Sequence, residues 1–326
     1  MYTFKNILCV VSTDETSKQA LQHAMAVAEA QQAELTLVSV IEDLPQKLEL
    51  QDDFIAGEKI MNSLIAERRK YLKDMVASID GSPSIQQKVL TGTAFISIVY
   101  EVLRYQHDLV IKVADNKSRL QSLFGSLDMH LLRKCPAPLW LLKDTAPRKH
   151  RRILAAVDVN DFYPEAEMTT RRDLNRHTLD VAAAVAEYEQ AELYVVSAWE
   201  AIAEDFMRAG VVTPSEGSVD SYVDSVNRRY QANMHELMTE AGVSGNSSKL
   251  ASNMVQSVLL KGAPRKKLPE FAEEIDADLV VMGTVARTGI SGLIMGNTAE
   301  TILNELQCSV LAVKPPGFTS PVKLDD

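Results

Sequence analysis

The sequence predicts an α/β protein made of two tandem, doubly wound, open parallel sheets, each with five strands in the order 3-2-1-4-5 and helices on both faces. Three observations predict this fold class. The chain has 326 residues, which favours two domains of roughly 150 residues over a single core. Its two halves repeat each other, and within each half short β-branched runs alternate with stretches of helical periodicity.

An internal repeat relates segments of the first half to segments of the second in the same order. Residues 7–12 match residues 153–158, and residues 33–39 match residues 191–197. The remaining matched pairs are 89–94 with 259–264, 107–111 with 277–281, and 138–143 with 309–314. A tandem duplication therefore predicts one domain over residues 1–146, a second over residues 151–316, and a C-terminal tail over residues 317–326.

Apolar runs rich in β-branched residues predict the strands of the first half, near residues 6–12, 34–41, 85–90, 108–113 and 138–142. Helices are expected between them, near residues 15–31, 55–79, 94–106 and 125–134. The first helix places Ala20, Leu21, Ala24 and Val27 on one face at the three-and-four spacing. Continuously apolar strands are typical of a parallel sheet covered on both faces, and the matched segments predict the same elements in the second half.

Composition and charge exclude several kinds of partner. The formal net charge of −10 predicts repulsion of nucleic acid, and no run approaches the roughly 18 apolar residues that membrane insertion requires. The basic connection over residues 143–152 lacks interleaved aromatics and is interpreted as a solvated linker. Cys9, Cys135 and Cys308 lie in or near apolar runs, which predicts buried thiols in a reducing compartment and therefore a cytoplasmic protein.

The segment between Val280 and Thr301 is the strongest indication of a ligand site. An apolar strand end leads into a loop opened by Gly283, and residues 296–298 lead into a helix. Glycines let the backbone approach a ligand closely, and the unpaired N–H groups at the start of a helix suit phosphate. The local sequence is equally consistent with two ordinary turns and a helix cap.

No motif in the sequence predicts catalysis or a metal site. The chain has no Gly-x4-Gly-Lys-Ser/Thr loop and no Gly-x-Ser-x-Gly elbow. None of its 6 histidines stands at a short ligand spacing from another. We therefore expect a non-catalytic protein that binds a small molecule, with no metal required by the sequence.

These residues resemble the universal stress protein family, over essentially the whole of both halves, and the layout is most similar to its tandem-domain members. Nucleotide-binding members have an Asp at the end of the first strand and a Gly-x2-Gly-x9-Gly-Ser/Thr loop after the fourth. The second half carries Asp158 and the run Gly283-x2-Ala286-x9-Gly296-Asn297. This run keeps the nine-residue interval, but it replaces the middle glycine and the Ser or Thr.

The resemblance implies that the second half binds ATP or a related nucleotide, weakly because of these two replacements. Asp158 would meet the adenosine end, and the backbone of Ala198 would contact the base. The other implied contacts are with base and ribose at Met282 and Gly283 and with phosphate at Gly296, Asn297 and Thr298, in a loop that includes Ala286. Arg287 is added here on chemical grounds and not from the family pattern, because a guanidinium in a loop beside a phosphate site can pair with the phosphate.

The first half departs further from the family pattern. Ser12 stands at the position of Asp158, and Val113-Ala114-Asp115-Asn116 replaces the glycine opening. Eleven residues separate Val113 from Gly125, against twelve between Gly283 and Gly296. Because a Cβ at the loop opening obstructs a close approach, we expect bound nucleotide in the second half only.

Two other functions stay open on the sequence alone. One is a carrier of an apolar or amphipathic ligand beside apolar stretches, which are Phe54, Ile55, Ile60, Met61, Leu64 and Ile65 in the first half and Phe206, Met207, Val211 and Val212 in the second. The other is a ligand-free scaffold for protein partners. In it, residues 139–142 and 310–313 pair as an intrachain pseudo-dimer and leave a further homodimer open. The extra segment over residues 200–220 is either a lid or a long loop.

Overall fold

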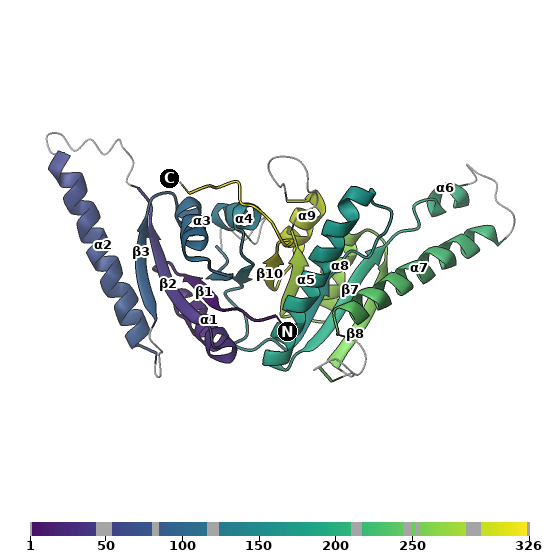
Figure 1. Cartoon of the computed structure of the whole chain (residues 1–326), viewed down its shortest axis with the longest axis horizontal. Coiled ribbons are helices and arrows are strands. Elements are labelled where there is room, and N and C mark those ends of the chain that lie inside the picture. Colours follow the sequence, from purple (N-terminus) through teal and green to yellow (C-terminus); the bar gives the residue numbers. More distant parts are fainter. Residues whose placement is uncertain are drawn as a thin grey trace. The chain divides into compact units, whose positions relative to one another are not determined.

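The computed structural model describes residues 2–43, 54–79, 85–115, 124–209, 217–243, 250–251, 254–284 and 295–324 (Figure 1). The elements of the first half are β1 (Asn6–Val10), α1 (Ser17–Gln31), β2 (Glu34–Ile41), α2 (Phe54–Ala77), β3 (Gln86–Thr91), α3 (Ala94–Tyr105), β4 (Leu109–Val113), α4 (Ser126–Lys134) and β5 (Leu139–Leu142). Those of the second half are β6 (Arg152–Ala156), α5 (Glu165–Glu189), β7 (Glu192–Trp199), α6 (Glu204–Arg208), α7 (Ser218–Glu240), β8 (Val255–Lys261), α8 (Pro264–Glu274), β9 (Leu279–Gly283), α9 (Asn297–Glu305) and β10 (Ser309–Val313). The strands and helices predicted in the first half are therefore confirmed, within two residues at each end.

The strands join in one ten-stranded sheet, in the order β3-β2-β1-β4-β5-β10-β9-β6-β7-β8. Each half keeps the predicted order 3-2-1-4-5, and β1 and β6 each pair in parallel with both of their neighbours. The prediction of two separate five-stranded sheets was wrong, because β10 pairs with β5 and places Leu311 opposite Trp140. This antiparallel pairing is the one expected between the two apolar strands, which it removes from the exposed edges.

The chain divides into two compact units. One comprises residues 3–148, 309–312 and 318–326, and the other comprises residues 1–2, 149–308 and 313–317. Most of β10, the last strand of the sequence, therefore belongs to the compact unit that the first half of the sequence forms. The C-terminal tail joins the same unit, where the Ser320 hydroxyl donates a hydrogen bond of 2.7 Å to the carbonyl of Lys134.

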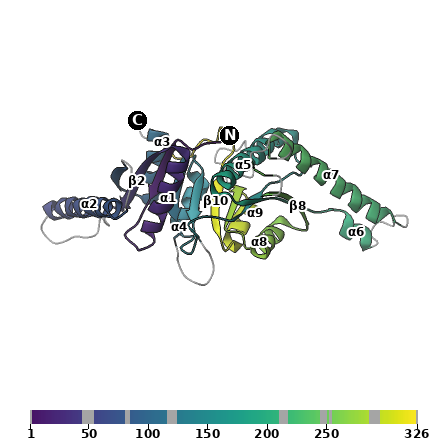
Figure 2. The same cartoon turned by 90° about the horizontal axis from the view of Figure 1, so that it is seen from below.

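Burial along the strands follows their place in the sheet. Strands β4, β5 and β10 are buried along nearly their whole length, as their continuous apolar character predicts. The outermost strands, β3 and β8, expose several residues, because each has a neighbouring strand on one side only. Figure 2 shows α5 and α7 on one side of the second-half strands, and α8 and α9 on the other.

The cysteines follow the prediction in part. Cys9 and Cys135 are buried, and burial raises the pKa of the Cys9 thiol above its ordinary value. Cys308 is only half-buried, since it lies in the short turn between α9 and β10. In the described part of the chain, no helix has both the length and the apolar character that crossing a bilayer requires.

Candidate functional site

A cavity of about 370 Å³ lies at the carboxyl ends of β6, β7 and β9. It sits where the order of the strands reverses around β6, which is where doubly wound sheets bind their ligands. The start of α9 and one face of α5 also line it, together with Tyr230 of α7 and with Pro264 and Leu268 of α8. Seven of the residues named from the sequence line it: Asp158, Ala198, Met282, Gly283, Gly296, Asn297 and Thr298. Ala286 and Arg287 lie outside the described residues.

The turn that follows β6 holds Asp158 at the cavity. The Asn175 side chain on α5 accepts a hydrogen bond from the Asp158 N–H (3.0 Å) and donates one to the Asp158 carbonyl (2.7 Å). The Asp158 carboxylate accepts hydrogen bonds from the Asn160 N–H (3.2 Å) and the Tyr163 hydroxyl (2.8 Å). Burial, and then the charge of Asp158, raise the pKa of Tyr163 to about 12, so this hydroxyl stays protonated and keeps donating at neutral pH.

Arg171 on α5 is a second partner of the Asp158 carboxylate. Its Nη1 lies 3.3 Å from Asp158 Oδ2, and its Nη2 lies 3.1 Å from the carboxylate of Glu167 one turn earlier. The guanidinium also stacks on the Tyr163 ring, with Cζ 3.4 Å from the ring centroid. A ligand hydroxyl or amine that approaches Asp158 therefore competes with a partner already in place.

The opposite end of the cavity is the N-terminus of α9. Gly296 is the N-cap residue, and its own N–H donates to the Thr284 carbonyl at 3.3 Å. Asn297 and Thr298 follow as exposed residues of the first helical turn, whose N–H groups have no acceptor within the helix. Such a helix start favours an anion through its N–H donors and its dipole.

Gly283 is required by packing on the side of the strand that faces α5. A Cβ added to Gly283 would lie 2.6 Å from a methyl carbon of Leu174. The family pattern assigns this glycine to close approach by a ligand, and in the structure the Leu174 side chain also packs closely against it. The cavity-lining part of α5 itself was missed. Arg171, Leu174, Asn175 and Thr178 follow the three-and-four spacing of one helix face, which was available as a signal.

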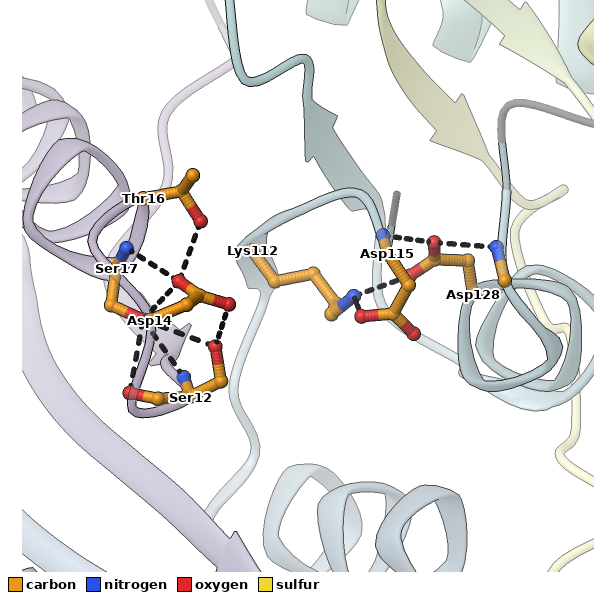
Figure 3. Close-up of polar contacts among 8 residues, drawn as sticks. Ser12, Asp14, Thr16, Ser17, Lys112, Asp115 and Asp128 are labelled. Carbon is orange, nitrogen blue, oxygen red and sulfur yellow. Dashed lines mark hydrogen bonds and ion pairs between the residues drawn. The ribbon is translucent and has the colours of Figure 1, made fainter. Parts of the chain in front are cut away.

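The equivalent region of the first half has a cavity of about 460 Å³ with different chemistry. The Ser12 hydroxyl donates a 2.5 Å hydrogen bond to Asp14, which also accepts from the hydroxyls of Thr16 and Ser17 (Figure 3). Burial raises the pKa of the Asp14 carboxyl, but these hydrogen bonds outweigh it and hold that pKa below its ordinary value. The Asp14 carboxylate thus accepts its hydrogen bonds from hydroxyl groups of the residues around it in the chain.

Comparison with known proteins identifies the class to which this fold and site belong. The family model described as "Universal stress protein family" matches residues 3–143 and 150–314, so the chain belongs to the universal stress protein family. It is 27% identical to universal stress protein E of Escherichia coli K12 over 329 residues, which cover 100% of this chain and 99% of the relative. It is equally similar, at 27% over 323 residues, to the universal stress protein E homolog of Haemophilus influenzae, covering 96% of this chain and 98% of the relative.

Solved structures give the same result for the fold. A universal stress protein from Pseudomonas aeruginosa UCBPP-PA14 superimposes with a TM-score of 0.65 at 25% identity, covering 96% of this chain and 94% of that chain. A universal stress protein from Archaeoglobus fulgidus superimposes with a TM-score of 0.61 at 17% identity, covering 96% and 99%. The tandem arrangement is therefore shared along nearly the full length of these proteins.

Proposed function

We propose that the cavity of the second half binds ATP or a related adenine nucleotide, with the phosphates at the N-terminus of α9. The observation that carries the proposal is the convergence of Asp158, Ala198, Gly283 and residues 296–298 on one cavity of about 370 Å³. These residues come from separate parts of the sequence. They occupy the positions to which the family pattern assigns base, ribose and phosphate contacts.

The charges around the cavity predict weak binding. Among the described residues that line it, Arg171 is the one cation, and its guanidinium already pairs with Asp158 and Glu167. The phosphates would therefore be held mainly by N–H groups of α9. We expect micromolar or poorer affinity, which corresponds to a binding free energy of about 8 kcal/mol or less.

A charge at the first residue of α9 tests the proposal. Asn297 is the exposed first residue of α9, and Ser126 holds the same exposed position in α4 of the first half. A carboxylate at a helix N-terminus stabilises the helix by about 0.3–1 kcal/mol, but it repels phosphate. We expect Asn297→Asp to raise the Kd for ATP at least ~10-fold, about 1.4 kcal/mol, without lowering the Tm.

Isothermal titration calorimetry measures both affinities, with Ser126→Asp as the matched control that leaves ATP binding unchanged. Wild-type affinity in Asn297→Asp would contradict the proposed site. Gly283 is a poorer position for this test, because any side chain there collides with Leu174 and disturbs packing as well as binding.

We infer binding without hydrolysis, independent of a divalent metal. Asp158, a carboxylate that lines the cavity, accepts hydrogen bonds from Tyr163 and Arg171 and is therefore poorly suited to act as a general base. Incubation of the protein with ATP should release no inorganic phosphate above background, and ATP binding should persist in EDTA. The cytoplasmic location inferred from the cysteines stays a prediction, which cell fractionation tests.

The second candidate function is a carrier of an amphipathic ligand. Ile202 lines the rim of the same cavity with 74% of its surface exposed, and Phe206 on α6 is 61% exposed. Val211 and Val212, which the sequence analysis grouped with them, lie outside the described residues, as do the side chains of Phe54 and Ile55. Mass spectrometry of an organic extract of the native protein separates the two functions, since an acyl chain favours the carrier and an adenine nucleotide favours the first proposal.

A further inference from the structure

In the first half, a carboxylate of the chain itself lies where the second half would hold a phosphate. Asp128, in the first turn of α4, accepts hydrogen bonds from the N–H of Gly125 (3.2 Å) and the N–H of Asp115 (2.7 Å). The Lys112 ammonium at the end of β4 pairs with the other carboxylate oxygen (Figure 3). The Asp128 side chain is fully buried and that of Lys112 is 5% exposed. Three donors from a strand, a loop and a helix start therefore converge on one buried anion.

The two halves differ at these positions in a specific way. Lys112 is in register with Val10, as Met282 is with Ala156, so Lys112 and Met282 are equivalent. Gly125 caps α4 as Gly296 caps α9, which makes Ala299 the equivalent of Asp128. The second half thus has a thioether and a methyl group where the first half has an ion pair.

We propose that the first half contains an anion site for a phosphate or a phosphate ester, which the Asp128 carboxylate occupies as a built-in ligand. The donors are those that a helix-terminal phosphate site uses: N–H groups at a helix start, a loop N–H and a lysine. The site is closed for as long as Asp128 fills it. This inference concerns the first half alone and stands whether or not the second half binds nucleotide.

The geometry also explains why Gly125 is retained in a half that has lost the other loop glycine. A Cβ on Gly125 would lie 2.6 Å from the Cβ of Asp115. The glycine lets the loop and the helix start come close enough for both N–H groups to reach the same carboxylate. Lys112 keeps a second partner, Asp115, at 2.9 Å, so removing Asp128 does not leave the buried ammonium unpaired.

The test removes Asp128 and supplies inorganic phosphate as the probe. The full chain carries Asn297→Asp throughout, which weakens anion binding at the start of α9, so that a gain in phosphate response between variants comes from the first half. In this background we expect Asp128→Ala to bind phosphate at least ten-fold more tightly than the chain that retains Asp128. Phosphate-dependent Tm and calorimetry give the two readouts. Adding Lys112→Met, which installs the second-half residue, should abolish the gain.

Two further variants guard against a folding defect. Asp128→Ser leaves room for phosphate and should show the same gain, whereas the near-isosteric Asp128→Asn keeps the N–H contacts and should show a smaller one. A folded Asp128→Ala, Asp128→Ser or Asp128→Asn chain whose phosphate response equals that of the Asp128 chain overturns the proposal. Tight phosphate binding by the chain that retains Asp128 overturns it as well.

Discussion

Arg171 pairs with the carboxylate of Asp158 and would compete for it with a ligand in the proposed site. Its guanidinium is partly exposed, lies 3.3 Å from that carboxylate and stacks on Tyr163, so it holds the acceptor that the family pattern assigns to the adenosine end. Exposed ion pairs contribute about 0–1 kcal/mol, because solvent screens them. We therefore expect a modest competition, which in the proposed site would act on the sugar or base end of the nucleotide rather than on the phosphates.

Arg171→Gln should tighten adenosine and ATP binding by about two- to five-fold, the range that an exposed ion pair of up to ~1 kcal/mol allows. Calorimetry with adenosine isolates the end of the ligand that Asp158 meets. The control is Arg172→Gln, since Arg172 is the adjacent residue and pairs with Glu236 and Glu240 on α7 instead. Unchanged or weaker adenosine binding in Arg171→Gln would show that Arg171 does not compete for Asp158.

At the residue scale, some positions could be predicted from the sequence and some contacts could not. The sequence predicted that Asp158, Gly283 and residues 296–298 lie together because each has a fixed place in the family motif, and they line one cavity. The roles of Leu174 and Asp115 at Gly283 and Gly125 were not found. The Leu174–Gly283 contact joins two elements far apart in the chain, and no local spacing predicts which side chain packs against either glycine.

At the scale of the element, three helices end on a glutamine in the left-handed conformation. Gln32, Gln106 and Gln190 cap α1, α3 and α5 with φ of 53°, 56° and 55°. Glycine is the usual residue at this position, because a Cβ costs about 1 kcal/mol there. The helix ends were nonetheless predicted within one residue, since the apolar periodicity of α1 and α3 stops at the same point.

Gln190→Gly should raise the free energy of unfolding by up to about 1 kcal/mol, because it relieves the left-handed strain at the end of α5. The greater entropy of the unfolded glycine chain offsets part of this gain. Thermal or urea unfolding measures the change. Gln190→Ala is the matched control: it removes the exposed side chain but keeps the Cβ, so equal stabilisation by both variants would refute the strain argument.

For the molecule as a whole, resistance to acid depends on carboxylates that are paired in the fold. Glu101 on α3 is 5% exposed, with Lys88 Nζ at 2.6 Å and His107 Nε2 at 3.7 Å. Burial raises the pKa of Glu101, but the proximity of His107 and the hydrogen-bonded Lys88 ammonium outweigh burial and hold this pKa below its ordinary value. A carboxyl with a depressed pKa stabilises the fold above its unfolded pKa, near 4.3, and this stabilisation is lost as the pH falls through the folded value.

Glu101→Gln should therefore destabilise the protein by about 2 kcal/mol at pH 7, the loss expected for a hydrogen bond to a charged group. The difference from wild type should shrink as the pH falls below about 4. Urea unfolding at a series of pH values measures both. Glu15→Gln, at an exposed position at the start of the first half, should leave the pH profile unchanged. A constant difference between Glu101→Gln and wild type at every pH would contradict the assignment.

The sequence by itself determined the tandem repeat, the order of strands within each half and seven of the residues that line the second-half cavity, because periodicity and motif spacing are local or repeated features. Tertiary structure alone decided that β5 and β10 pair, so that ten strands form one sheet. It also decided that the Asp128 carboxylate lies between Lys112 and two backbone N–H groups. Both outcomes depend on which groups meet in the folded chain rather than on local periodicity, and burial then makes their pairing obligatory, since unpaired strand edges and buried charges are costly.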